Sequence, residues 1–267
     1  MLTHTSVCSA LLFVVLSIAC GGASTPVDDP FTGAPERTVV VGDGKRAVFV
    51  TPSGSDCVQI GTQCVRPQDK CGPGARADVI VDSKGKVLEI VCYPPAPSAP
   101  PVESTGDIDL GKDNKATVTL DGQADGADIA GDVRSRGNNV TIYGQGPGVS
   151  LIGGSVVADG NNFSMRGVTV QRNVTVKGNN ATLVLCVIEG DLLIEGNNAV
   201  MAECTVLGKV TIKGNNAVLV ANRIAGGLSV DGKEAVCDGN LQFTDGNANR
   251  VADPGELGVP LACSNKK

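Results

Sequence analysis

VTVKGNNATLVLCVIEGD, residues 174–191, is followed directly by LLIEGNNAVMAECTVLGK (192–209) and VTIKGNNAVLVANRIAGG (210–227). The three segments align along their whole length, and self-similarity at a fixed period is the signature of a solenoid. Each unit is too short for two helices and a turn, and it is rich in Val, Ile and Thr, which favour strands. We therefore expect an all-β protein, a parallel β-helix with about 18 residues per coil and coils about 4.8 Å apart.

Alternate apolar residues of each unit are predicted to face the interior, because successive side chains of a strand point to opposite faces. In the first unit these residues are Val174, Val176, Ala181, Leu183 and Ile188. Glycines, such as Gly178 and Gly190, are expected at the tight corners between strands.

Two rows of polar residues predict that the coils stack in register. Gly-Asn-Asn recurs at 137–139, 160–162, 178–180, 196–198 and 214–216, which indicates a ladder of asparagine amides. The residue before each glycine alternates in charge along the series Arg136, Asp159, Lys177, Glu195, Lys213 and Asp231. Exposed ion pairs stabilise by only about 0.2–1 kcal/mol each. We therefore interpret the row as register control, because skipping a coil would set like charges side by side.

The repeat is predicted to span 107–236 and to begin with two longer coils, about 108–132 and 133–155. Their extra residues fall near 121–127 and 145–149, at the same corner of adjacent coils, and we expect a contact surface there. The first insertion holds three acidic residues that we interpret as solvated, Asp121, Asp125 and Asp128.

Residues 1–19 have the features of a signal peptide, with an apolar run at 11–19 that is too short to span a bilayer. The end of this segment resembles a bacterial lipobox, in which Cys20 becomes the acylated first residue. The alternative is ordinary cleavage after Ala19 and a free secreted protein. Export is expected either way. The lipobox predicts a lipoprotein of the bacterial envelope, at the outer membrane or surface, anchored through a tether at 20–35.

Eight cysteines remain when Cys8 and Cys20 are set aside, and an even number in an exported protein favours disulfides. Four of them lie in a small β module predicted over 36–95, where two disulfides are expected: Cys57, Cys64, Cys71 and Cys92. A Pro-rich linker at 96–106 separates this module from the repeats.

The other four cysteines belong to the repeats and to the end of the chain. Cys186 and Cys204 occupy equivalent positions in adjacent units, which fits either a disulfide or two stacked buried thiols. Cys237 and Cys263 are expected to close a C-terminal cap over 237–267.

The cap contains DGNANRVADPGE (245–256), whose oxygen-bearing side chains fall at positions 1, 3, 5, 9 and 12 of the EF-hand calcium loop. The predicted ligands are Asp245, Asn247, Asn249, the carbonyl of Val251, Asp253 and Glu256. Arg250 stands where the motif has Gly, and no amphipathic helices flank the loop. Two interpretations stay open: a structural Ca²⁺ site, or a polar turn without metal.

The amino-acid composition excludes several classes of function. The formal charge of −6 gives no broad basic face for nucleic acid. The single histidine, His4, lies in the predicted signal peptide, which excludes imidazole-dependent sites from the mature protein. Aromatic residues make up only 3% of the chain, whereas polysaccharide-cleaving β-helices need paired carboxylates or an Arg/Lys base in a cleft with aromatic subsites. We therefore expect a protein that is not an enzyme, with no catalytic residues and no cofactor besides the possible Ca²⁺.

The repeats GNNATLVL, EGNNAV and KGNNAVLV resemble the bacterial domain-of-unknown-function 3060 family of exported repeat proteins, over roughly residues 105–240. The resemblance implies an envelope protein and supplies no catalytic residues. We expect a rigid β-helical scaffold or binding surface whose partner is an envelope protein or a glycan. One alternative is a carbohydrate-active β-helix. The other is a self-assembling polymer, because the short repeat also resembles bactofilins, although the cap and export signal argue against it.

Overall fold

The computed structural model describes residues 47–50, 58–60, 63–72, 76–82, 84–93, 101–122 and 126–263. The predictions for the signal peptide, Cys20, the tether, Cys57 and the Pro-rich segment up to residue 100 lie outside the described residues. So does the prediction for Asp125.

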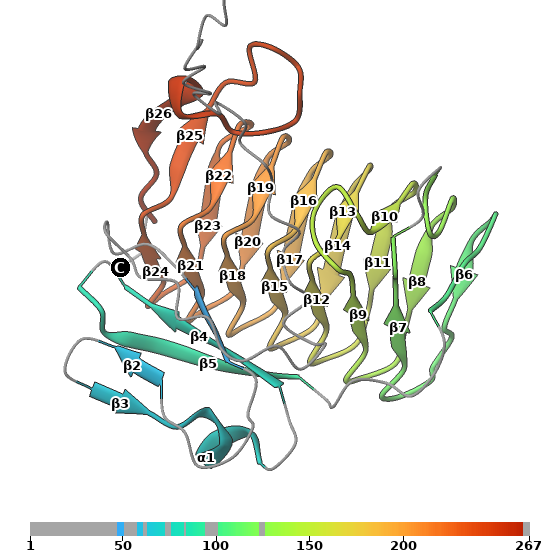
Figure 1. The fold of residues 1–267 in the computed structure, drawn as a ribbon, viewed down its shortest axis with the longest axis horizontal. Helices are drawn as coiled ribbons and strands as arrows, with labels where there is room; N and C mark the ends of the chain where they lie inside the picture. Colours follow the sequence, from blue (N-terminus) through green and yellow to red (C-terminus); the bar gives the residue numbers. More distant parts are fainter. Residues whose placement is uncertain are drawn as a thin grey trace, which may run out of the picture.

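Residues 101–122 and 126–263 form a parallel β-solenoid whose three faces are three sheets of seven strands (Figure 1). Sheet 1 contains β6 (Ile108–Asp109), β8 (Val133–Ser135), β11 (Val156–Ala158), β14 (Val174–Lys177), β17 (Leu192–Glu195), β20 (Val210–Lys213) and β23 (Leu228–Asp231). Sheet 2 contains β7 (Thr117–Thr119), β9 (Thr141–Tyr143), β12 (Ser164–Arg166), β15 (Thr182–Val184), β18 (Val200–Ala202), β21 (Val218–Val220) and β24 (Val236–Asp238). Sheet 3 contains β10 (Leu151–Ile152), β13 (Thr169–Val170), β16 (Val187–Ile188), β19 (Thr205–Val206), β22 (Arg223–Ile224), β25 (Leu241–Phe243) and β26 (Leu257–Pro260).

The register confirms the predicted period. Val174 pairs with Leu192, and Leu192 pairs with Val210, so equivalent residues of successive units lie side by side. The first two coils are longer, with spacings of 25 and 23 residues, and the later spacing is 18 residues. The fold is therefore the predicted β-helix.

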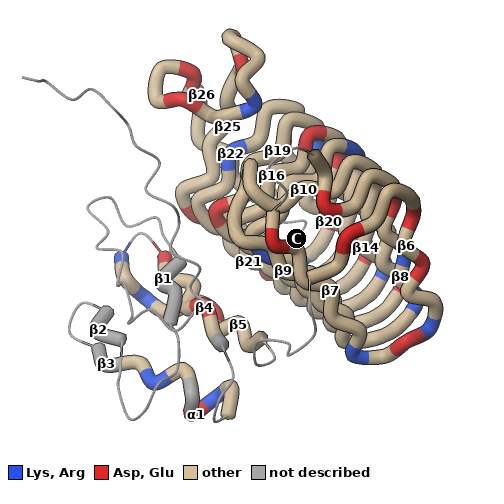
Figure 2. Tube along the Cα trace, turned by 45° about the vertical axis from the view of Figure 1, so that its right-hand side comes forward, with Lys and Arg blue, Asp and Glu red and all other residues tan. Residues whose placement is uncertain are grey.

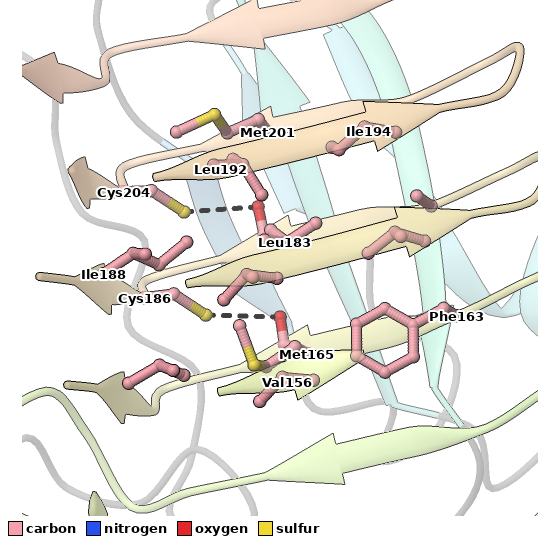
Figure 3. Close-up of a cluster of buried hydrophobic side chains, with 14 of the residues drawn as sticks. Val156, Phe163, Met165, Leu183, Cys186, Ile188, Leu192, Ile194, Met201 and Cys204 are labelled. Carbon is pink, nitrogen blue, oxygen red and sulfur yellow. Dashed lines mark hydrogen bonds between the residues drawn. The ribbon is translucent and has the colours of Figure 1, made fainter. Parts of the chain in front are cut away.

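The interior holds the apolar residues that alternation predicted. Val174, Val176, Ala181, Leu183 and Ile188 are fully buried. Figure 3 shows side chains from successive coils filling the space between the sheets in layers. Since a single coil has no second surface for these side chains, the stack is the unit that buries them.

The Gly-Asn-Asn corner is built from three different constraints. A Cβ on Gly196 would lie 2.0 Å from the carbonyl oxygen of Gly178, so only glycine allows the coils to approach this closely. At the middle position, the Asn197 N–H donates to the side-chain Oδ1 of Asn179, 2.8 Å away. The third residue, such as Asn198, has a positive φ of 58°, which asparagine tolerates better than most residues.

The third asparagines also form the predicted amide ladder. Each Nδ2 donates to the Oδ1 of the asparagine one coil earlier, at 2.7 Å from Asn180 to Asn162 and 2.9 Å from Asn198 to Asn180. Beside this ladder the charged row stacks in register, and Lys213 Nζ lies 2.8 Å from Glu195 Oε1. Figure 2 shows acidic and basic residues gathered at the coil corners. The Lys213 ammonium lowers the pKa of Glu195.

The N-terminal module contains an antiparallel sheet of β1 (Ala47–Val50), β4 (Arg76–Val81) and β5 (Val87–Tyr93), in the order β1-β4-β5. A short helix, α1 (Pro67–Cys71), contacts β4 and β5, and the Cys71–Cys92 disulfide joins α1 to β5. A second hairpin pairs β2 (Val58–Ile60) with β3 (Gln63–Val65). Strands β4 and β5 pair antiparallel, in agreement with the predicted β module.

At the C-terminal end the parallel pattern stops. β26 runs antiparallel to β25, after the 3-10 helix Pro254–Glu256. The Cys237–Cys263 disulfide joins β24 to the chain beyond β26. Strand β26 thereby pairs with the last strand of sheet 3, whose edge would otherwise be open to another chain.

Candidate functional site

The module packs on the outer face of sheet 2, a contact that the sequence analysis did not predict. In Figure 1 strands β4 and β5 lie beneath the strands of sheet 2. The two parts share one buried apolar cluster, made of Ile80, Val91 and Tyr93 from the module and of Tyr143, Val184, Val200, Ala202, Val220 and Ala221 from the solenoid. A signal for this contact was present in the sequence. In the run ATLVL (181–185) the outward Val184 is apolar, like the inward Ala181 and Leu183, and apolar residues on both sides are typical of strands covered on both faces.

A buried ion pair lies inside this apolar interface. Arg166 Nε donates to Asp78 Oδ2 at 3.1 Å, and each side chain is only 3% exposed. The two residues are 88 positions apart in the chain, so no local pattern could have paired them. Removing one partner of a buried pair leaves an uncompensated charge, which makes the pair sensitive to any shift of the module.

Two tyrosines flank the ion pair. The rings of Tyr93 and Tyr143 have centroids 5.7 Å apart at an interplanar angle of 59°. Burial raises the pKa of Tyr93 well above its usual value, and the negative charge of the nearby Asp78 carboxylate raises it further. The hydroxyl therefore stays neutral over the physiological pH range.

A groove of about 340 Å³ runs between the module and the asparagine corner. Its module wall consists of Lys70, Glu89, Ile90, Val91 and Cys92, and its solenoid wall of Asn162, Phe163, Ser164, Asn180, Thr182, Asn198 and Val200. Lys70 and Glu89 form an ion pair at this groove. Ser164 Oγ is buried and has no hydrogen-bond partner among the described residues. The groove therefore offers amide, hydroxyl and paired charged groups, which suit hydrogen bonding to a ligand.

The C-terminal loop brings the six predicted calcium ligands into one turn. Asp245 accepts hydrogen bonds from the Asn249 and Arg250 N–H groups at 3.1 Å, and Glu256 Oε1 accepts from the Gly246 N–H at 2.8 Å. Arg250 adopts the left-handed φ of 64° that the motif reserves for Gly. Its guanidinium reaches Glu189 of the solenoid at 2.8 Å.

The loop has the oxygen donors that Ca²⁺ prefers, namely carboxylates, amide oxygens and a backbone carbonyl. The Asn247 and Asn249 amides both donate to Asp253 Oδ2, at 2.9 and 3.0 Å. Within the described part of the chain, no group of three or more His, Cys, Asp or Glu side chains is arranged to hold a metal ion. The donor types fit Ca²⁺, and binding it would require the two asparagine amides to turn their oxygens inward.

The two insertions of the early coils lie against each other. A Cβ on Gly122 would meet a Val149 side-chain atom at 2.4 Å. Asp128 joins the two insertions, accepting from the Gly122 N–H and the Leu151 N–H, each at 2.8 Å. Asp128 is only 1% exposed, so its interpretation as a solvated carboxylate was wrong. The insertion needs this carboxylate because it satisfies backbone donors that turn away from the strand ladder.

Cys186 and Cys204 are free, fully buried thiols, so of the two alternatives the disulfide is wrong. Their side chains point in the same direction from stacked positions, and each donates to a carbonyl of the previous coil: Cys186 to Met165 and Cys204 to Leu183, both at 3.5 Å (Figure 3). Burial raises the pKa of the Cys204 thiol well above its usual range.

The same column continues as Asn222 and Asn240, a buried amide pair that sequence reasoning missed. Asn222 Nδ2 donates to the Met201 carbonyl at 2.9 Å and to Asn240 Oδ1 at 2.8 Å. The cysteines therefore occupy positions where the side chain bonds to a strand carbonyl of sheet 2 in the preceding coil, which is a structural role. The signal was the 18-residue spacing that links all four residues.

These features define a parallel β-solenoid protein with an N-terminal module docked on one face. Comparison with protein-family models, curated proteins and solved structures finds no match to this chain. In the described residues, no helix combines the length and apolar character needed to cross a membrane.

Proposed function

We propose that this protein is an exported, lipid-anchored scaffold of the bacterial envelope that presents a binding groove and is not an enzyme. The observation that carries the proposal is the groove between the module and the asparagine corner. Two segments far apart in sequence build its walls, and hydrogen-bonding groups repeat along it at each coil. The solenoid interior is filled by apolar side chains, which favours recognition on the outer surface.

The groove chemistry supports binding over catalysis. Of the residues that line it, Glu89 is the one carboxylate, and it is paired with Lys70. Glycoside cleavage uses two carboxyl groups that flank the scissile bond. Amides, hydroxyls and an ion pair can instead hold an envelope component in place by hydrogen bonds.

A photo-crosslinking side chain placed at Thr182, in the groove, tests recognition in the native envelope. We expect it to capture a discrete envelope component. The same group at Thr205, an outward position on sheet 3 about one coil further on, should not capture that component. Equal capture at both positions, or none at Thr182, would contradict the binding groove.

Membrane anchoring is tested separately through Cys20. We expect the wild-type protein to fractionate with membranes and to carry an acylated N-terminus by intact mass, and Cys20→Ser to be soluble. Cys8→Ser, within the predicted signal peptide, is the matched control and should remain with the membrane. Soluble wild-type protein beginning at residue 20 without acyl chains would favour the secreted alternative.

We also propose that the 245–256 loop binds a structural Ca²⁺. The support is the placement of Asp245, Asn247, Asn249, Val251, Asp253 and Glu256 in one turn next to the last strands. A bound cation would hold the loop that leads into β26.

A further inference from the structure

The surface on which the module docks is periodic. Sheet 2 presents a column of outward side chains at the last residue of each strand, at successive coil spacings of about 4.8 Å. In chain order the column reads Thr119, Tyr143, Arg166, Val184, Ala202, Val220 and Asp238. Apolar contact alone would hold the module in nearly equal positions over several of these coils, because hydrophobic burial is not directional.

The Asp78–Arg166 ion pair makes one of these docking positions more favourable than the others. Among the seven described residues of the column, Arg166 alone carries a positive charge. A shift of the module by one coil would place Asp78 against Tyr143 or Val184 and leave the carboxylate buried without its cation. The Tyr93–Tyr143 contact is less selective, because an aromatic ring can also pack against Val or Ala.

We infer that Arg166 selects the coil on which the module docks, and that it is thereby a positioning residue for the groove. Because one groove wall belongs to β5 and α1 and the other to the solenoid, the docking position decides which coils line the groove. With Asp78 on Arg166, the wall contains Asn162, Asn180 and Asn198. This inference holds whatever ligand the groove binds.

Moving the arginine by one coil tests the inference directly. In Arg166→Val with Val184→Arg, position 166 takes the residue found at 184 and 220, and the cation moves one coil toward the C-terminus. Eight residue steps connect Tyr93 to Pro101 and can span at most about 26–29 Å, several times the spacing of one coil. The module should follow the arginine.

The position of the module can be measured by pulsed electron spin resonance. Spin-labelled noncanonical residues at Lys84 in the module and at Lys112 or Lys233 in the solenoid, all exposed, leave the native cysteines untouched. In the double variant we expect the Lys84–Lys233 distance to shorten and the Lys84–Lys112 distance to lengthen, each by up to about 4.8 Å. Arg166→Val alone should broaden the distributions of both spin-label distances, because the module would then occupy more than one position.

Thr175→Arg provides the matched control. It adds an outward arginine to the coil that contains Val184, but on sheet 1, and should leave both distances unchanged. Unchanged, narrow distances in the double variant or in Arg166→Val would overturn the inference. Should the double variant not fold, the charge swap Asp78→Arg with Arg166→Asp decides instead. It should restore the native distances that each single change disturbs, and failure to restore them would also overturn the inference.

Discussion

At the scale of single residues, the close stacking of the coils requires specific residue types at the corners, where one additional side-chain atom would prevent two coils from packing. The glycine of each Gly-Asn-Asn corner is the clearest case, since the carbonyl of the preceding coil occupies the place of a Cβ. The asparagines that follow satisfy backbone N–H groups of the next coil. Corner sequence and stacking distance are therefore linked through direct contact.

Gly196→Ala should strongly destabilise the solenoid. The added Cβ would lie 2.0 Å from the Gly178 oxygen, and backbone cannot move aside as a flexible side chain can. We expect a loss of about 3 kcal/mol or more, at the upper end of overpacking costs, as a lower denaturation midpoint in urea. Gly255→Ala has no atom within 4 Å of its new Cβ and should change the midpoint little. Equal effects of the two changes would contradict this account of the corner.

The buried tyrosine at the module interface predicts a pH effect. The pKa of Tyr93 is raised in the folded state, so above about pH 10 the unfolded chain loses a proton that the folded chain keeps. Stability therefore falls as pH rises through this window, by up to about 1.4 kcal/mol per pH unit, until the folded-state pKa is reached. Tyr93→Phe should show a shallower fall between pH 10 and 11 in urea titrations, and Tyr143→Phe serves as the comparison. A fall in Tyr93→Phe as steep as in the wild type would contradict the assignment.

At the scale of elements, the ends of the stack differ from its middle. Interior strands pair on both sides, whereas the C-terminal end uses an antiparallel strand, a disulfide and a twelve-residue loop. The loop contacts the solenoid through Arg250 and Glu189. Anything that orders this loop should therefore stabilise the last coils.

Calcium should raise the melting temperature of the protein by ordering this loop. Glu256→Ala removes a carboxylate that now accepts the Gly246 N–H, and it should abolish the calcium-dependent increase. Glu234→Ala, an exposed acidic residue at a coil corner outside the loop, should retain it. The measurement is differential scanning calorimetry with and without Ca²⁺ after chelation. A melting temperature that does not respond to Ca²⁺ in the wild type would favour the metal-free turn.

At the scale of the whole molecule, the solenoid is a one-dimensional stack that carries a non-repeating partner. Each coil contacts mainly its neighbours, so coils can in principle be removed in units of 18 residues. Because the sign of the charge alternates along the charged row, adjacent coils carry opposite charges and coils two apart carry like charges. Removing one coil joins Lys177 to Lys213, which have the same charge.

Deletion of 192–209 should give a folded, less stable protein in which the role of Lys213 reverses. In the full chain, Lys213→Gln removes the pair with Glu195 and should destabilise by about 0.2–1 kcal/mol. In the deletion it removes repulsion from Lys177 and should be neutral or stabilising. Urea denaturation of the four proteins measures both effects. The same sign and size in both backgrounds would contradict register control by charge.

Much of the solenoid followed from the sequence alone, because its interactions repeat at a fixed chain separation. The 18-residue period, the inward residues and the asparagine ladder are all contacts between equivalent positions, and one unit predicts the next. The cysteine column was ambiguous, since spacing places two side chains side by side without saying whether they bond. Only the three-dimensional structure shows that both point toward strand carbonyls of the preceding coil.

The docked module was decided by tertiary structure. Asp78 lies in β4 of the module and Arg166 in β12 of the solenoid, 88 residues apart, and no repeated spacing in the sequence links the two positions. Their contact exists because the outward face of sheet 2 is apolar over several coils and must be covered, and because a buried carboxylate needs a cation. A repeated spacing in the sequence predicts contacts between neighbouring coils. Which outer surface of the stack is covered, and by which segment, is determined only in the tertiary structure.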